Sequence, residues 1–100
     1  MKLRDVASVL RSKNAGPLTL TVDILFASAE DYARAVASPQ LTGSAVAQAY
    51  GVAPAGVELI RVPQALALKI NLPRPVVAGS PGDRDVYGAQ QHVPLLDLEI

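Results

Sequence analysis

The strongest indication of the fold is an alternation of apolar and polar residues across residues 17–26, PLTLTVDILF. Thr19, Thr21 and Asp23 occupy one face of this segment when it is extended. The opposite face carries Leu18, Leu20, Val22, Ile24 and Phe26. A period of two is typical of a strand that buries one face and exposes the other. The chain is therefore expected to contain a sheet with one face packed on the core.

Two further strands are predicted at residues 57–62 (VELIRV) and 65–72 (ALALKINL). The link between them is so short that we expect antiparallel neighbours. In the second of these strands, Lys69 and Asn71 should point outward. The inward set is Leu66, Leu68, Ile70 and Leu72. A last strand is expected at residues 95–100, LLDLEI, with Leu96, Leu98 and Ile100 on one face.

Helix signals lie between the first two predicted strands. Ser28 is placed to cap a helix that continues until Pro39 interrupts it, with Asp31 in the capping-box position. A second short helix should begin after Thr42 and stop at Gly51, with Val46, Ala49 and Tyr50 as its apolar face. The opening segment, residues 3–14, is ambiguous. The spacing of Leu3, Val6 and Leu10 favours a helix, and a strand remains the alternative.

These elements predict one α+β domain over residues 1–100. The simplest arrangement that buries every apolar face is a ferredoxin-like sandwich, a mainly antiparallel sheet with helices on one face. Half of the 100 residues are hydrophobic and mean hydropathy is +0.27, which is typical of a folded chain. Residues 73–83 hold several prolines and glycines and should form a loop, and residues 85–92 a short helix.

Charge and composition narrow the class of partner. Nine basic residues balance nine acidic ones, so neither nucleic acid nor an anionic membrane is expected as a partner. There is no cysteine, which rules out disulfides and thiolate metal sites. The N-terminus has no apolar signal segment, and no apolar run approaches the roughly 20 residues of a membrane span. A cytoplasmic location is expected.

The charges are unevenly distributed along the chain. Residues 1–16 contain four basic side chains and one acidic, a net charge of +3; residues 73–100 contain two basic and four acidic, a net charge of −2. One hypothesis is that the two ends lie together and neutralise each other at one site, and chance in a short chain is the alternative.

The basic head of the chain offers Arg11, Ser12, Lys13 and Asn14 as donors for a carboxylate or phosphate. A solvated turn before the first strand explains the same residues structurally.

The tail, GSPGDRDVYGAQQHVPLL, holds most of the remaining polar candidates. They are Asp83, Asp85, Tyr87, Gln90, Gln91 and His92. His92 is the one histidine, but no serine or cysteine nucleophile pairs with it at a known spacing, so a structural hydrogen bond is the simpler explanation. Two carboxylates and one histidine are an incomplete metal set, and carboxylates that cap a helix are favoured over a metal site. Neither a metal nor a cofactor is expected.

The stretches KLRDVASVLRSKNAGP, LTVDILF and PRPVVAGSPGDRDVYGAQQHVPLLDLEI resemble the DUF4387 family of small bacterial proteins. That family is in turn similar to the C-terminal ferredoxin-fold domain of the acyclic terpene utilisation protein AtuA. There, a polar RSGDKGD segment takes the place of residues 11–16. The resemblance implies a ferredoxin-like fold and marks the head and tail residues named above as binding or interface positions.

For function, the resemblance implies an accessory module or small subunit that pairs with a large AtuA-like protein in carboxylic-acid or acyl-CoA catabolism. Its polar head and tail would help bind an anionic small molecule. Two alternatives stay open. One is a homo-oligomeric ligand-binding module, because ferredoxin-like sheets have free edges. The other is an independent lyase or isomerase using His92 with Lys13 and Asp83 or Asp85. Whether the chain is an enzyme is left undecided.

Overall fold

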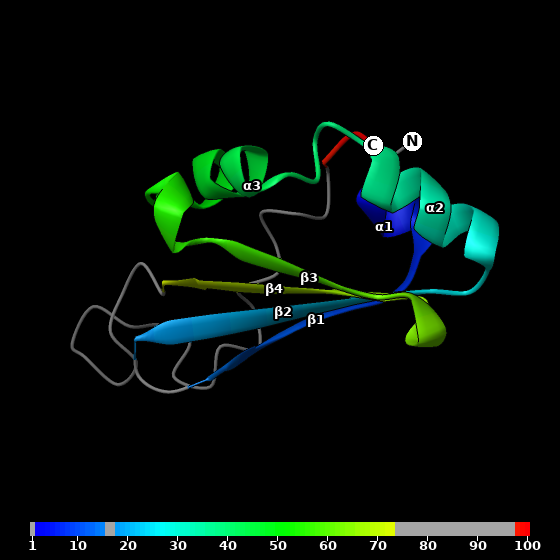
Figure 1. The fold of residues 1–100 in the computed structure, drawn as a ribbon, viewed down its shortest axis with the longest axis horizontal. Coiled ribbons are helices and arrows are strands. Elements are labelled where there is room, and N and C mark those ends of the chain that lie inside the picture. The colour runs from blue at the N-terminus through cyan, green and yellow to red at the C-terminus, as the bar shows by residue number, and fades with distance from the viewer. Residues whose placement is uncertain (1, 16–17, 74–97) are drawn as a thin grey trace.

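The computed structural model describes residues 2–15, 18–73 and 98–100. Its sheet is antiparallel throughout and has the strand order β1-β2-β4-β3. The strands are β1 (Ala7–Asn14), β2 (Thr19–Phe26), β3 (Glu58–Val62) and β4 (Ala67–Pro73). The helices are α1 (Leu3–Val6), α2 (Ala29–Ala37) and α3 (Gly43–Tyr50), and all three lie on one face of the sheet (Figure 1). The predicted α+β class is confirmed, and the arrangement is consistent with a ferredoxin-like fold.

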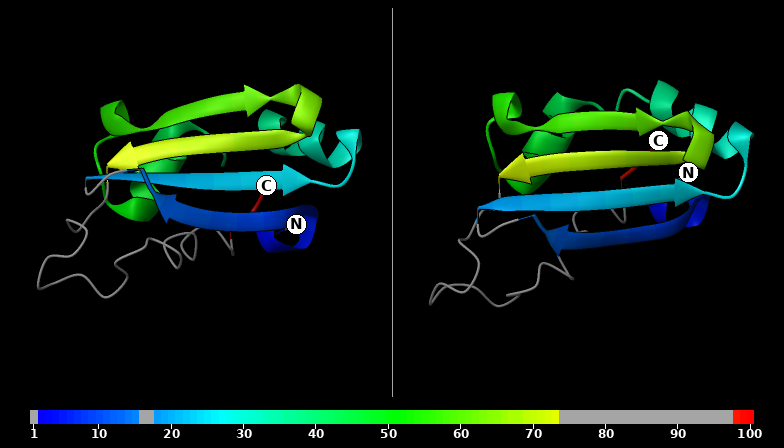
Figure 2. Two further views of the ribbon diagram at one scale, coloured as in Figure 1. Left: turned by 90° about the horizontal axis from the view of Figure 1, so that it is seen from below. Right: turned by 60° about the horizontal axis from the view of Figure 1, so that its bottom comes forward.

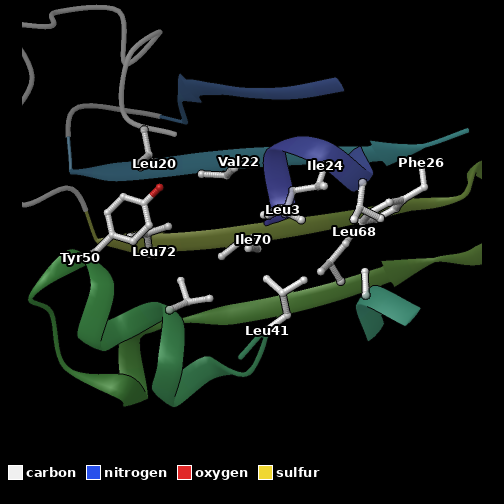
Figure 3. Packing of buried hydrophobic residues seen from close by; sticks show 13 residues of the cluster. Leu3, Leu20, Val22, Ile24, Phe26, Leu41, Tyr50, Leu68, Ile70 and Leu72 are labelled. Carbon is white, nitrogen blue, oxygen red and sulfur yellow. The ribbon is translucent and has the colours of Figure 1, made fainter. Parts of the chain in front are cut away.

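The two faces of the sheet differ in what covers them. The helices pack on one face, which we call the inner face, and in the views of Figure 2 the opposite, outer face looks away from them. The inner face supplies the core: the fully or nearly fully buried apolar residues of the strands are Leu20, Val22, Ile24, Phe26, Leu68, Ile70 and Leu72. Thr21 lies on the outer face, which was predicted to be exposed, but it is also buried, at 4% exposure. Figure 3 shows Leu3, Leu41 and Tyr50 closing over them from the helical layer. The alternation read from the sequence therefore orients β2 and β4 as predicted.

The helix ends also follow the sequence signals. The Ser28 hydroxyl accepts a hydrogen bond from the Asp31 amide at 3.1 Å, and the Thr42 hydroxyl accepts one from the Ala45 amide at 3.2 Å. Each bond satisfies one of the free amides at a helix start. Gly51 ends α3 in the left-handed conformation, at φ 68°, where a residue without Cβ is not strained. These local signals fix where α2 begins and where α3 begins and ends.

Three details differ from the sequence predictions. Leu18 precedes β2 and is 62% exposed, so it is not part of the inward set. Leu66 lies before β4 in a left-handed conformation and is only half-buried. On α3 the buried alanine is Ala47, whereas Ala49 is exposed. At 100° per residue both alanines lie equally far from the direction set by Val46 and Tyr50, so the tilt of the helix on the sheet decides which is buried.

The helix predicted over residues 3–14 is wrong beyond its first turn. After α1, the chain runs as β1 and pairs with β2 from Ala7 opposite Phe26 to Asn14 opposite Leu20. The spacing of Leu3, Val6 and Leu10 led to the wrong prediction because it also fits one helical turn followed by a strand. Leu3 and Val6 are buried from α1, and Leu10 packs against the same core from β1. Pairing with β2, which the segment's own pattern does not reveal, selects the extended conformation.

The two described ends of the chain meet beside α1. Lys2 and Glu99 form an isolated antiparallel bridge, and the Leu3 amide donates to the Leu98 carbonyl at 2.8 Å. Leu98 and Ile100 pack against the core, in line with the alternation predicted for the last strand. Leu96, the predicted loop after Pro73 and the predicted helix at residues 85–92 lie outside the described residues.

Candidate functional site

The head residues Arg11, Ser12, Lys13 and Asn14 are the last four residues of β1. They alternate between the faces of the sheet, as the register with β2 shows. Ser12 stands opposite Val22 and Asn14 opposite Leu20, both inner-face positions, whereas Arg11 stands opposite Asp23 and Lys13 opposite Thr21. The segment is thus not a turn whose four side chains converge. It presents two neutral side chains to the interior and two cations to the outer face.

The inner half of this segment is buried. Ser12 is 8% exposed, and the side-chain oxygen Oδ1 of Asn14 is buried. The Tyr50 ring, from α3, packs over Leu20 and Leu72 with its hydroxyl pointing toward β2 (Figure 3). Burial raises the pKa of the Tyr50 phenol because the phenolate would lose its hydration. The hydroxyl therefore stays neutral at physiological pH at the rim of the core.

The outer half of the segment belongs to a row of charged residues. Arg11 Nε lies 3.7 Å from Asp23 Oδ2, and the two side chains are 68% and 17% exposed. On its other side Asp23 stands opposite Lys69 of β4. The carboxylate thus lies between two cations, one from each neighbouring strand. An ion pair with so exposed a partner contributes only about 0–1 kcal/mol to the free energy of unfolding. The row therefore sets the pattern of charge on the outer face and adds little to the stability of the fold.

A second row crosses the outer face one step closer to the Asn14 end of β1. The Thr21 hydroxyl donates to Asn71 Oδ1 at 2.8 Å, and Asn71 Nδ2 donates to Glu58 Oε1 at 3.0 Å. Lys13 stands opposite Thr21 and begins the row. Three strands are connected by these side-chain bonds, which hold the Glu58 carboxylate at the far end of the row from Lys13. Cross-strand pairs of this kind stabilise a sheet and fix side-chain positions on its surface.

The predicted partner segment of the head lies outside the described part of the chain. Asp83, Asp85, Tyr87, Gln90, Gln91 and His92 all belong to it, so a site shared by head and tail stays a prediction. The contact of the chain ends at Lys2 and Glu99 lies at the Ala7 end of β1, the far end of the strand from Asn14 (Figure 2). Within residues 2–15, 18–73 and 98–100, no group of three potential metal ligands occurs.

Comparison with known families gives one match. Residues 3–99 match the family described as "Domain of unknown function (DUF4387)". The chain belongs to the DUF4387 family. No curated protein and no solved structure matches it significantly. The DUF4387 match runs through every described helix and strand, so the sheet and both of its faces belong to the family domain.

The sequence missed the rows of this DUF4387 domain, although it placed most of their members on the outer face. Thr21, Asp23, Lys69 and Asn71 were predicted to point outward, but as separate solvated residues. Nothing local connects residue 23 with residue 69, or residue 58 with residue 71. Opposite charges at corresponding positions of two predicted strands, as at Asp23 and Lys69, are the signal that could have suggested the rows. No helix among the described residues is long and apolar enough to cross a membrane.

Proposed function

We propose that this DUF4387 chain is an accessory subunit that docks onto a large AtuA-like protein and completes a site for a carboxylate or acyl-CoA-type anion, in the cytoplasm. The observation that carries the proposal is the end of β1. There an edge strand of the described sheet presents Arg11 and Lys13 on its outer face and Ser12 and Asn14 on its inner face. One short segment thus combines charged and neutral donors at the rim of the domain.

Arg11 and Lys13 have the chemistry that recognises an anion. A guanidinium offers a planar fork of donors to a carboxylate or phosphate, and an ammonium offers a mobile point charge. Arg11 keeps about two thirds of its side chain in water beside Asp23, with an exposed fraction of 68%. Its loose ion pair at 3.7 Å can be exchanged for a ligand at small cost.

The exposure of these cations is the reason to propose a second chain. At about 4 Å, two unit charges attract by about 1 kcal/mol in water and by about 4 kcal/mol near a protein surface that excludes part of the water. A small anion therefore binds weakly to Arg11 and Lys13 on the isolated subunit. A partner that covers the end of β1 excludes water and strengthens the same contacts. The resemblance of the head segment to the corresponding segment of AtuA supports a large AtuA-like chain as that partner.

The test is co-purification. A tagged DUF4387 chain is co-expressed with the AtuA-like large protein of its own organism, and we expect a stable complex. Arg11→Gln/Lys13→Gln removes two positive charges at the end of β1 and should lower recovery of the large protein at least tenfold. The matched control is Gln40→Glu/Gln48→Glu, which changes the net charge by the same amount at two exposed residues outside the sheet. It should leave recovery unchanged.

Two outcomes would contradict the proposal. If the tagged chain retains no large protein, the accessory role fails. If both double variants lose the partner equally, net charge rather than the end of β1 is responsible, and the proposed docking position is wrong.

A further inference from the structure

The outer face carries three rows of side chains that cross all four strands. Residues in register on β1, β2, β4 and β3 make up each row. The polar row is Lys13, Thr21, Asn71 and Glu58; the charged row is Arg11, Asp23, Lys69 and Ile60; the apolar row is Val9, Leu25, Ala67 and Val62. The helices lie behind this face in Figure 2. Arg11, Lys13 and Glu58 on it are exposed, the Asp23 side chain is 17% exposed, and Thr21 is buried. The exposed ends of the rows and the partly exposed Asp23 and Lys69 are therefore the groups that a partner can contact.

The pattern is self-complementary in one orientation. We propose that two copies of the chain pack outer face to outer face around a two-fold axis that runs parallel to the strands, between β2 and β4. This rotation places β2 of one copy over β4 of the other and β1 over β3, while each row stays at its own level. Asp23 then faces Lys69 of the second copy, and Lys13 faces Glu58. Each contact occurs twice, as a two-fold interface requires.

The charges argue against the other aligned arrangement. A two-fold axis that runs across the strands along the charged row would place each strand over its own copy. Arg11 would then face Arg11, Asp23 would face Asp23 and Lys69 would face Lys69. Like charges in close contact cost several kcal/mol and exclude such a pairing. Charge complementarity on the outer face thus selects both the occupant, a second copy, and its orientation.

The apolar row adds a driving force at the Ala7 end of β1. Val9 is 39% exposed, and Ile60 of the adjacent row is 37% exposed. Both side chains therefore leave apolar surface in contact with water. In the proposed dimer the apolar row faces the same row of the second copy, with Val9 over Val62 and Leu25 over Ala67. Two sheets packed face to face lie about 10 Å apart with their strands within about 30°, which fits this alignment.

The size of the face predicts a weak dimer. Four strands about 4.8 Å apart and about six residues long give an area on the order of 400 Å², below the roughly 800 Å² per partner of a standard interface. We therefore expect association that depends on concentration, with Kd on the order of 1–100 μM. The inference does not rest on the proposed function, because it concerns the purified chain alone.

Sedimentation velocity and native mass spectrometry of the purified chain test the dimer, between about 1 μM and about 500 μM. Asp23→Lys puts lysine against Lys69 in a homodimer, and Lys69→Asp puts aspartate against Asp23. Each variant alone should remain monomeric over this range. Mixed in equal amounts, the two variants restore opposite charges at both facing positions, and a one-to-one heterodimer should form.

Opposite net charges alone must not explain that heterodimer. As a control, Asp23→Lys is mixed with Gln40→Glu/Gln48→Glu, which carries the same compensating net charge outside the outer face. This mixture should form no heterodimer. Val9→Asp, at an exposed position of the edge strand, gives a second route if a charge variant does not fold, and should abolish the homodimer. Circular dichroism confirms that each variant is folded.

Three results would overturn the proposal. A wild-type chain that stays monomeric at the highest concentration rules out the dimer. A dimer that persists in both single-charge variants and in Val9→Asp uses another surface. A heterodimer that forms equally well in the control mixture reflects net charge and not the facing pairs.

Discussion

Leu3 offers the most direct test of how the N-terminal segment is held. Its side chain is completely buried and lies over the inner faces of β2 and β4 (Figure 3), and its amide donates to the Leu98 carbonyl at 2.8 Å. Leu3→Ala removes apolar volume from the core and leaves a cavity. Such changes cost about 2–5 kcal/mol, so we expect the free energy of unfolding to fall by about 3 kcal/mol. For a domain of this size, that lowers Tm by about 10–25 °C.

Leu18→Ala is the matched control, because it makes the same chemical change at a residue that is 62% exposed. Its effect should lie within about 0.5 kcal/mol of the wild type. Urea unfolding followed by circular dichroism measures both variants, with the slope m unchanged if the unfolded state is unaffected. If the two variants differ by less than about 0.5 kcal/mol, Leu3 is not a core residue, and the placement of α1 against the sheet is incorrect.

Three further predictions use the same unfolding assay. Gly51→Ala should lower the free energy of unfolding by about 1–2 kcal/mol because φ at this residue is 68°. Gly43→Ala should be neutral or stabilising by up to about 1 kcal/mol, because a Cβ at this position meets nothing closer than 3.9 Å. Equal effects of the two substitutions would contradict this explanation. Ser28→Ala should cost about 1 kcal/mol by removing the cap of α2, and Ser28→Asp should retain the stability; a Ser28→Ala variant as stable as the wild type would count against the cap. Because burial raises the pKa of Tyr50, stability should be complete below about pH 10 and decline as the pH rises above it. Tyr50→Phe should show a smaller decline between about pH 8 and pH 11 than the wild type, and parallel curves would show that Tyr50 does not contribute.

The proposed partner and the proposed dimer both involve Lys13 of β1, but their centres differ and can be separated by experiment. In the dimer the centre of the interface is formed by β2 and β4, whereas β1, with the contact of Lys13, lies at its rim. Asp23→Lys should therefore disrupt self-association more strongly than Arg11→Gln/Lys13→Gln does. The double variant should act mainly on recovery of the large protein.

Local signals were sufficient for much of the fold. The alternation over residues 17–26 predicts a half-buried strand, which the structure forms from Thr19 to Phe26. Ser28 and Thr42 predict where two helices begin, and Gly51 predicts where the second helix ends. Each of these signals acts between residues a few positions apart, so it is present in the sequence whatever the rest of the chain does. The predicted antiparallel pairing of β3 and β4 likewise follows from their short connection and is confirmed.

Short-range periodicity and capping are thus enough to predict the class of fold, the buried faces of β2 and β4, the starts of α2 and α3 and the end of α3. That residues 7–14 form a strand depends on tertiary contacts, because the partner strand β2 supplies the pairing that selects the extended form. The same pairing, together with that of β2 and β4, brings Arg11, Asp23 and Lys69 into one row. Register is a joint property of two strands, and a shift of one residue would send every side chain of a strand to the opposite face. The charged surface of this domain is therefore encoded in pairs of residues that are far apart in the chain.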